Sequence, residues 1–281
     1  MNLLPGNSRK VQNTGTCLTF PWGKVVLCSI AVGLLGSASL SRADSLSPAN
    51  VSADELISKG DVYGAKFDAT KALDCYLPAL KLAPKNVDLL VRVARQYRHL
   101  MADATTKAEK LRLGTIALEY SYRAAELGPK DSDAQLSVAI TCGKMLPFLS
   151  SKEQAKMSPV IKSSAERAIK LNARNDTAWH ILGRWHQVVA QVGTVKRTVA
   201  SLIYSELPPA SNKEAVECFQ QAIKLNPDRG MHYVELGRTY GNMEQYDDAK
   251  VYLKKGLAMP DTEKDDSEIK RKGREMLAKI P

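Results

Sequence analysis

The sequence predicts an all-helical protein, a right-handed superhelix of about five helical hairpins with a capping helix at its C-terminus. Three observations lead to this fold class. Only 6% of the 281 residues are aromatic, and a chain rich in Ala, Leu and Lys favours helices. After residue 52, one pattern of small and aromatic residues returns at a fixed spacing, which is typical of stacked repeats. After residue 262, apolar residues at helical spacing stand among charges, as in a terminal cap.

The repeat is clearest at its two ends. Gly60 is followed, 3, 12, 16, 19 and 24 positions on, by Tyr63, Ala72, Tyr76, Ala79 and Pro84. Gly237 is followed at the first four of these offsets by Tyr240, Ala249, Leu253 and Gly256. This spacing is that of the tetratricopeptide repeat, whose two antiparallel helices cross at small residues while aromatic side chains fill the space beside the crossing. We therefore expect a tetratricopeptide-repeat-like α-solenoid.

Three less regular copies lie between these two. Their crossing residues are 23, 22 and 32 positions apart instead of 12, in the pairs Ala94 and Ala117, Ala139 and Ile161, and Gly183 and Ala215. Each middle unit is therefore expected to carry a long insertion between its two helices. The predicted repeats lie near 53–86, 87–130, 131–174, 175–228 and 229–261. A capping helix over 263–280 follows them, and we interpret its charges as a solvated face.

The longest insertion, 188–211, has a helical pattern of its own. Apolar residues recur at helical spacing, at Val195, Val199, Leu202 and Ile203. We expect an amphipathic helix that packs its apolar side on the solenoid, since burying one face is the default for such a helix. A membrane or a partner protein is the alternative surface for this apolar side.

The first 43 residues have the order of a secretory signal peptide. Basic residues precede the apolar run 25–40, and a small-x-small cleavage site ends at Ala43. The run is short for a membrane span, which needs roughly 20 residues. We predict cleavage after Ala43, export to the periplasm or the outside, a linker over 44–52, and the repeat domain over 53–281. An uncleaved anchor, in which 25–40 is the membrane contact, and a mitochondrial presequence are the alternatives.

The sequence does not contain the groups that most enzymes need. The five cysteines and four histidines include no close pair of the kind that holds zinc, so we expect no metal and no disulfide framework. Cys75, Cys142 and Cys218 are interpreted as small core residues. No phosphate-binding Gly-rich loop and no nucleophile elbow occurs. We therefore predict no catalysis and no cofactor. We expect no nucleic-acid partner. Cleavage would lower the net charge from +10 to +6, which is mildly basic and says little about partners.

The repeat register predicts a binding groove. In such solenoids the first helix of each unit lines the concave face, and the residue after the small crossing position points inward: Arg95, Arg184 and Arg238. Residues one turn away complete the candidate surface: Arg98, His99, His180, Gln187 and Asn242. Because Arg grips carboxylates with two parallel bonds, this row favours an acidic peptide or a C-terminal carboxylate. The alternative is that the arginines are solvated charges on an exposed helix.

From Ile161 to Pro260 the chain resembles the regulator of microtubule dynamics family, which is built from divergent tetratricopeptide-like repeats. The stretches that carry the likeness are "AERAIKLNARNDTAWHILGRW", "LPPASNKEAVECFQQA" and "LGRTY", and "LLVRVARQY" at 89–97 fits the family's opening helix. The resemblance covers most of the chain from about residue 87. It implies microtubule association and a cytoplasmic or mitochondrial location in a eukaryote. The signal-like N-terminus departs from that pattern.

Two functional hypotheses follow. The first is a non-enzymatic, exported scaffold that binds a protein or peptide, acidic partners included, in the concave groove. The second is a structural protein held at a membrane by residues 25–40 and associated with microtubules, as the resemblance implies.

Overall fold

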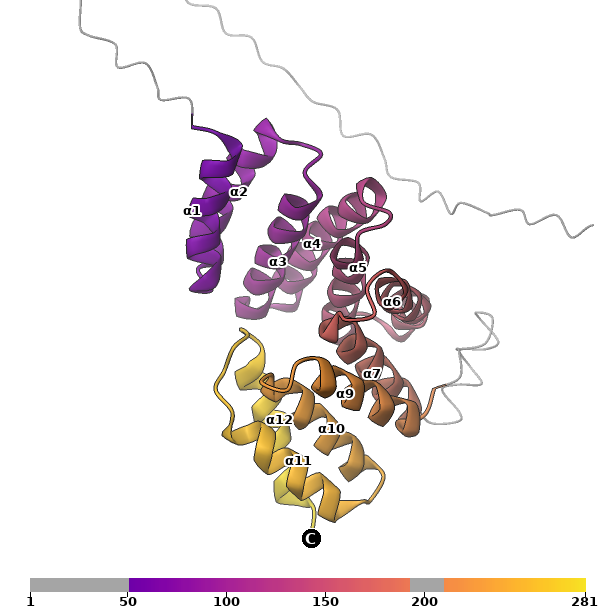
Figure 1. Ribbon diagram of the computed structural model, residues 1–281. Coiled ribbons are helices and arrows are strands. Elements are labelled where there is room, and N and C mark those ends of the chain that lie inside the picture. The colour runs from indigo at the N-terminus through magenta and orange to yellow at the C-terminus, as the bar shows by residue number, and fades with distance from the viewer. Residues whose placement is uncertain (1–50, 193–209) are drawn as a thin grey trace, which may run out of the picture. The chain divides into compact units, whose positions relative to one another are not determined.

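Five helical hairpins make up the fold (Figure 1). The computed structural model describes residues 51–192 and 210–281, and within these two ranges the secondary structure is helical, without a strand. The hairpins are α1 (Ala53–Ala65) with α2 (Ala69–Leu82), α3 (Val87–Asp103) with α4 (Lys107–Leu127), α5 (Ser132–Met145) with α6 (Ser151–Leu171), α7 (Asp176–Ala190) with α9 (Asn212–Leu225), and α10 (Gly230–Asn242) with α11 (Tyr246–Ala258). A short 3₁₀ helix, η1 (Leu146–Phe148), follows α5, and α12 (Asp266–Lys279) comes last. The predicted class, an all-α solenoid of the tetratricopeptide type, is confirmed.

Glycines allow the two helices of a hairpin to approach each other closely. A side-chain carbon at Gly237 would lie 2.8 Å from the backbone nitrogen of Leu253. At Gly60 such a carbon would lie 2.4 Å from the ring of Tyr76. Both distances are shorter than van der Waals contact, so neither position has room even for a methyl group. The crossing partner Ala72 has no exposed surface.

The extra residues of the second and third hairpins mostly lengthen helices. α3 and α4 contain 17 and 21 residues, and only 104–106 separate them. In the third hairpin, η1 and the 21-residue α6 take up the added length. This differs from the inserted segments that the spacing led us to expect. The reason is local, because Thr106 and Ser150 accept hydrogen bonds from the first turns of α4 and α6 and so start these helices early.

Side-chain caps start several of the helices. In each case the backbone N–H three residues on donates to the capping side chain, which belongs to Ser52, Asn86, Asn175 or Ser211. These bonds satisfy N–H groups that the first helical turn leaves without a partner, and each is worth about 1 kcal/mol.

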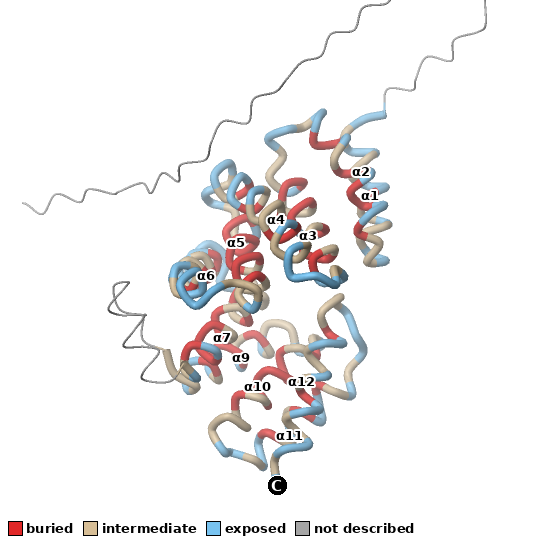
Figure 2. The backbone as a smooth tube through the Cα atoms, turned by 180° about the vertical axis from the view of Figure 1, so that it is seen from behind, coloured by how far each residue is buried: buried red, intermediate tan, exposed pale blue. Residues whose placement is uncertain are grey.

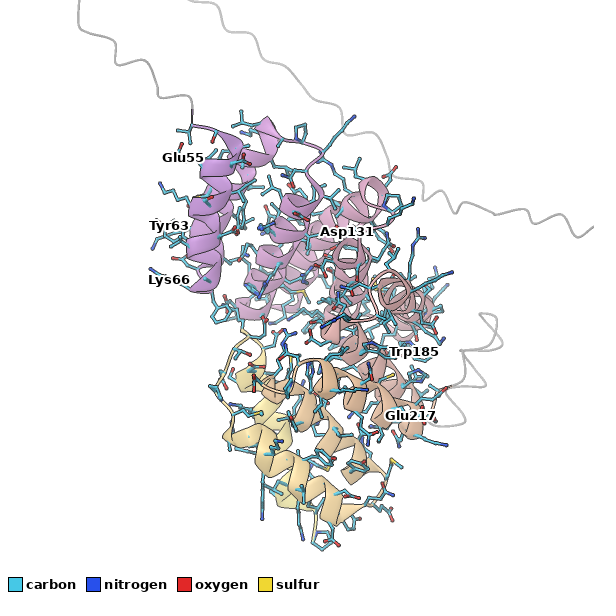
Figure 3. The ribbon with its side chains drawn as sticks, in the orientation of Figure 1. Glu55, Tyr63, Lys66, Asp131, Trp185 and Glu217 are labelled. Atoms are coloured by element: carbon cyan, nitrogen blue, oxygen red, sulfur yellow. The ribbon has the colours of Figure 1, made fainter. Side chains whose placement is uncertain are left out.

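Buried residues lie along the facing sides of neighbouring helices (Figure 2). Trp185 on α7 is only 4% exposed, and its indole N–H donates to the carbonyl of Ser158 on α6 at 2.9 Å (Figure 3). Cys75, Cys142 and Cys218 are buried free thiols, as predicted for small core residues. Burial raises the pKa of the Cys142 and Cys218 thiols to about 12, so both stay protonated and unreactive.

The final helix packs on the fifth hairpin. α12 contacts α10 and α11, and a side-chain carbon at Gly241 would lie 2.7 Å from the sulfur of Met276. A side-chain carbon at Gly273 would likewise lie 2.7 Å from a side-chain carbon of Val234. The lack of a side chain at Gly273 therefore leaves room for Val234. The position of α12 agrees with the cap expected over 263–280. It also covers the part of α10 that holds Gly241.

Two expectations fall outside the described ranges: the signal segment 1–43 and the amphipathic helix around 195–203. Within the described ranges, no helix is both long enough and apolar enough to cross a membrane.

Candidate functional site

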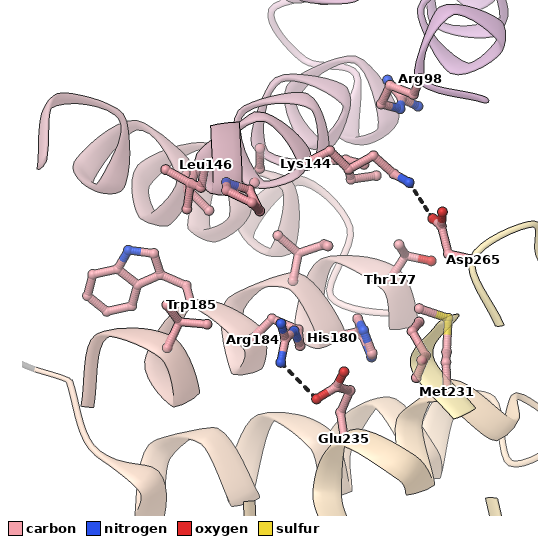
Figure 4. Close-up of a pocket in the computed structure, with 18 of the residues that line it drawn as sticks. Arg98, Lys144, Leu146, Thr177, His180, Arg184, Trp185, Met231, Glu235 and Asp265 are labelled. Carbon is pink, nitrogen blue, oxygen red and sulfur yellow. Dashed lines mark hydrogen bonds and ion pairs between the residues drawn. The ribbon is translucent and has the colours of Figure 1, made fainter. Parts of the chain in front are cut away.

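A groove with a volume of about 2280 Å³ opens along the first helices of the middle repeats. α3, α5 and α7 line one side of it together with η1, part of α6 and Lys110 of α4. The other side comes from the segment before α10, the start of α10, the residues between α11 and α12, and the first half of α12. Leu146 and Trp185 belong to its apolar part, and Arg98 and Lys144 to its charged part (Figure 4). The outer helices α2, α9 and α11 do not contribute to it. The groove therefore follows the first helices of the repeats.

Five of the eight predicted site residues line the groove: Arg95, Arg98, His99, His180 and Arg184. Gln187 instead lies between α7 and α10, where its side-chain nitrogen donates to the carbonyl of Glu235 at 3.1 Å and to the hydroxyl of Thr239 at 2.8 Å. Arg238 and Asn242 lie later on α10, beyond the stretch of that helix that lines the groove.

The three arginines expected in one row each contact a carboxylate of the chain itself. Arg95 Nη2 lies 2.8 Å from Glu263 Oε2. Arg184 Nη1 and Arg238 Nη1 lie 2.8 Å and 2.7 Å from the same oxygen, Glu235 Oε2. Burial alone would raise the pKa of Glu235, which is 2% exposed, but the charges of the two arginines outweigh it and lower the pKa. Two of the arginines therefore stabilise a buried carboxylate, while the side chain of Arg95 remains 47% exposed.

Arg98 is a buried cation on the floor of the groove. It is 5% exposed, its Nη1 donates to the hydroxyls of Ser137 and Thr141 at 3.0 Å and 3.1 Å, and it forms no ion pair within the part of the chain that the structure describes. Burial, assisted by the charge of Arg95, lowers its pKa to about 10, so it stays charged at neutral pH. Beside it, the Nδ1 of His99 is buried and has no hydrogen-bond partner among the described residues. The floor thus carries a positive charge that no contacting side chain neutralises.

A chain of three polar groups joins α7 to α10. His180 Nδ1 and His232 Nδ1 are 3.0 Å apart, and His232 Nε2 lies 3.0 Å from Asp176 Oδ2. Because a carboxylate can only accept, His232 donates through Nε2, so a neutral His232 accepts at Nδ1 and His180 is the donor there. Burial alone would raise the pKa of Asp176, but hydrogen bonds from His232 and Arg229 outweigh it and lower the pKa to about 2. This cluster holds two repeats together, and no group of three His, Cys, Asp or Glu in residues 51–192 and 210–281 could hold a metal ion.

The fold should lose stability as the pH falls below 6.5. Burial lowers the pKa of His99 to about 3 and lowers the pKa values of His180 and His232 below 6.5. Each stays neutral in the fold while the unfolded chain takes up a proton, so their stabilisation is complete above 6.5 and is lost as the pH falls toward the folded values. For His99, whose pKa is about 3 in the fold, the loss should approach about 1.4 kcal/mol per pH unit between 6.5 and that value.

Urea unfolding followed by far-UV circular dichroism above and below pH 6.5 measures this loss. His99→Gln should make the unfolding free energy depend less steeply on pH, by the contribution of one histidine. An unfolding free energy that stays constant across the window would contradict the assigned neutral states. Asp176 remains ionised throughout it, since its pKa is about 2.

Sequence reasoning missed two further cations of the groove and the ion pairs that they form. Lys144 binds Asp265, and Arg229 binds both Asp176 and Glu263. Glu263 and Asp265 come from the segment before α12, whose charges we expected to face solvent, whereas Asp176 is the first residue of α7. The alternation of acidic residues after Pro260 was the available signal, but only the packing of α12 brings this segment back to α3 and α5.

The comparisons with known proteins agree with the repeat pattern. A family model described as Regulator of microtubule dynamics protein 1-3 matches residues 52–281. Regulator of microtubule dynamics protein 1 of Bos taurus is 28% identical over 195 residues, which are 69% of this chain and 62% of that protein. Regulator of microtubule dynamics protein 3 of Xenopus laevis is 26% identical over 191 residues, which are 68% of this chain and 41% of that protein. The chain thus matches less than two thirds of the length of either relative.

Among solved structures, a thermophilic tetratricopeptide-repeat protein of Thermus thermophilus superposes with a TM-score of 0.60. The match covers 81% of this chain and 100% of that one at 17% sequence identity. At this identity the likeness concerns the fold alone.

Proposed function

This chain belongs to the regulator of microtubule dynamics family, and from that membership and its groove we propose that it is a non-enzymatic scaffold that binds a peptide or protein partner. The observation that carries the proposal is the groove of about 2280 Å³ along the first helices of consecutive repeats. Pockets for small molecules are commonly about 300 to 1,000 Å³, so this groove suits an extended segment. Apolar residues would supply contact area, and the charged ones would select the partner.

A photo-crosslinker placed in the groove tests this proposal. Ala102 near the end of α3 is exposed and lines the groove, whereas Ala258 at the end of α11 is exposed and does not. A crosslinking amino acid at Ala102, in the full chain and in its native cells, should yield a discrete protein adduct. The same amino acid at Ala258 is the matched control. If Ala102 gives no adduct, or if both positions give the same one, the groove is not the binding site.

Charge reversal in the groove should then lower the yield of this adduct. Arg95 and Lys152 line the groove and have exposed side chains, so Arg95→Glu with Lys152→Glu should reduce the yield about tenfold while the circular dichroism spectrum stays unchanged. Lys81→Glu with Lys254→Glu makes the same charge change outside the groove and should leave the yield at the wild-type level. An equal loss in both double variants would mean that the net charge, not the groove, governs binding.

Microtubule association is the second candidate, favoured by the names of the matched relatives, which call them regulators of microtubule dynamics. Co-sedimentation of the full chain with purified microtubules tests it. No sedimentation, or equal sedimentation of the chain when microtubules are left out, would oppose it. Running the groove double variant beside the wild-type chain separates the two candidates, because binding through another surface would survive the reversal of Arg95 and Lys152.

The location in the cell depends on residues 1–43. We propose export after cleavage near Ala43, with an anchored chain as the alternative. N-terminal sequencing of the native protein distinguishes them: a start near Asp44 supports cleavage, and retention of 25–40 supports the anchor.

A further inference from the structure

A short acidic segment of the chain lies in the groove. We call residues 262–265, between α11 and α12, the strap. Glu263 accepts from Arg95 of α3 at 2.8 Å, and Asp265 accepts from Lys144 of α5. Lys264 donates to Asp103 of α3 at 2.8 Å. The strap therefore connects the end of the chain to two hairpins that lie more than a hundred residues earlier in the sequence.

The two sides of the groove carry opposite charge. Before residue 193 its lining includes six basic side chains (Arg95, Arg98, Lys110, Lys144, Lys152 and Arg184) and two acidic ones (Asp103 and Asp133). After residue 209 the lining has five acidic and three basic side chains, and the strap contributes two of these acidic residues. The first side, which we call the basic wall, would be left with unbalanced positive charge if the strap moved away.

The floor of the basic wall also has unused hydrogen-bonding capacity. Arg98 is 5% exposed and bonds only to two hydroxyl groups, leaving the remainder of its guanidinium without a partner among the described residues. His99 is equally buried, and its Nδ1 lacks a partner in the same part of the chain. A buried polar atom normally has a partner, so the unpartnered Nδ1 of His99, beside the charge of Arg98 on the groove floor, points to a ligand.

From these observations we propose that the basic wall is a binding site for an acidic extended peptide of a partner, and that the strap occupies this site as an internal substitute. The inference rests on the proposed function and names the partner's chemistry. The partner's carboxylates take the places of Glu263 and Asp265, which are two residues apart. A peptide with acidic residues at i and i+2 in an extended conformation presents both on one side. Binding then requires displacement of the strap, which lowers the apparent affinity of the intact chain.

The strap can lose its charges without losing its fold. The backbone N–H groups of Thr262 and Glu263 donate to Asp266 at 2.7 Å and 2.8 Å, and Asp266 is 2% exposed. These bonds do not involve the carboxylates of Glu263 and Asp265. After Glu263→Gln, Arg229 still has its ion pair with Asp176.

The test measures binding of a labelled acidic peptide to the full chain by fluorescence anisotropy. The probe is a synthetic peptide with the sequence of residues 258–267, "AMPDTEKDDS". The Glu263→Gln/Asp265→Asn chain should bind it about tenfold more tightly than the wild-type chain, and the gain should fall at high salt. Asp247→Asn/Glu275→Gln makes the same change in charge outside the strap and should bind like the wild type. Adding Arg95→Gln and Lys144→Gln to the strap variant should abolish the gain.

Each other outcome overturns the inference. Equal binding by the wild-type and strap variants would mean that the strap does not occupy the site. A second probe has amides in place of the carboxylates that correspond to Glu263 and Asp265. If it binds as tightly as the first probe, the basic wall does not recognise acidic residues. Binding of anionic phospholipid vesicles without binding of the peptide would assign the wall to a lipid surface. If Ala102 still crosslinks a partner in any of these cases, the groove function stands and only the acidic-peptide inference fails.

Discussion

Glu235→Gln should lower the free energy of unfolding by about 3 kcal/mol. Glu235 is 2% exposed, and its carboxylate lies within 2.8 Å of both Arg184 and Arg238. Removing one partner of a buried ion pair generally costs about 3 to 5 kcal/mol because the remaining charge stays buried. The two arginines are partly exposed, at 29% and 20%, so solvent compensates in part and we expect the lower end of this range. Equilibrium urea unfolding followed by circular dichroism provides the measurement.

Glu268→Gln is the matched control for this change. Glu268 also contacts two cations, Arg271 and Lys272, but its side chain is 51% exposed. Exposed ion pairs are worth at most about 1 kcal/mol. A similar loss in the two variants would contradict the buried ion pair, and a wild-type stability of Glu235→Gln would show that α7 and α10 are joined by other contacts. The same substitution should not be used to test groove binding, since it acts on the fold first.

Gly237→Ala should destabilise the fifth hairpin by roughly 1 to 3 kcal/mol through overpacking. The added carbon would lie 2.8 Å from the backbone nitrogen of Leu253 and 3.1 Å from the carbonyl oxygen of Ala249. Backbone atoms cannot move aside as a flexible side chain can, so α10 and α11 must separate. On an exposed helix the same change would be stabilising, because Ala is the better helix former by about 1 kcal/mol.

Gly143→Ala separates these two effects. Gly143 lies in α5, and no atom would come within 4 Å of its added carbon. We expect this variant to match or exceed the wild-type stability in thermal unfolding, while Gly237→Ala melts at a lower temperature. Equal behaviour of the two would mean that the α10–α11 crossing is looser than its geometry indicates.

Most of the fold could be predicted because its determinants are local. The small residues at Gly60 and Gly237 act on neighbours within one hairpin, and their spacing is visible in a single sequence. The middle hairpins were harder. Their spacing suggests inserted segments because the crossing residues alone do not tell whether added residues form a loop or extend a helix. Thr106 and Ser150 decide this by starting α4 and α6 early.

The candidate site was predicted less completely. The register placed Arg95, Arg98, His99, His180 and Arg184 on the first helices, and these residues line the groove. It also included Gln187 and Arg238, but whether a residue on such a helix faces the groove or a neighbouring helix depends on what packs there. Gln187 hydrogen-bonds to the backbone of α10, and Glu235 forms ion pairs with Arg184 and Arg238. The positions of these side chains therefore follow from contacts between repeats.

The sequence by itself determined the helices, their pairing and the face on which a groove would form, since helix propensity, capping and small-residue spacing act over one repeat. Only the tertiary structure decided which charges of that groove are already occupied. Arg95 and Glu263 are 168 positions apart, and Lys144 and Asp265 are 121 apart. Partners this distant meet because α12 packs against the fifth hairpin and brings the strap to α3 and α5, and no periodicity in the chain encodes that approach.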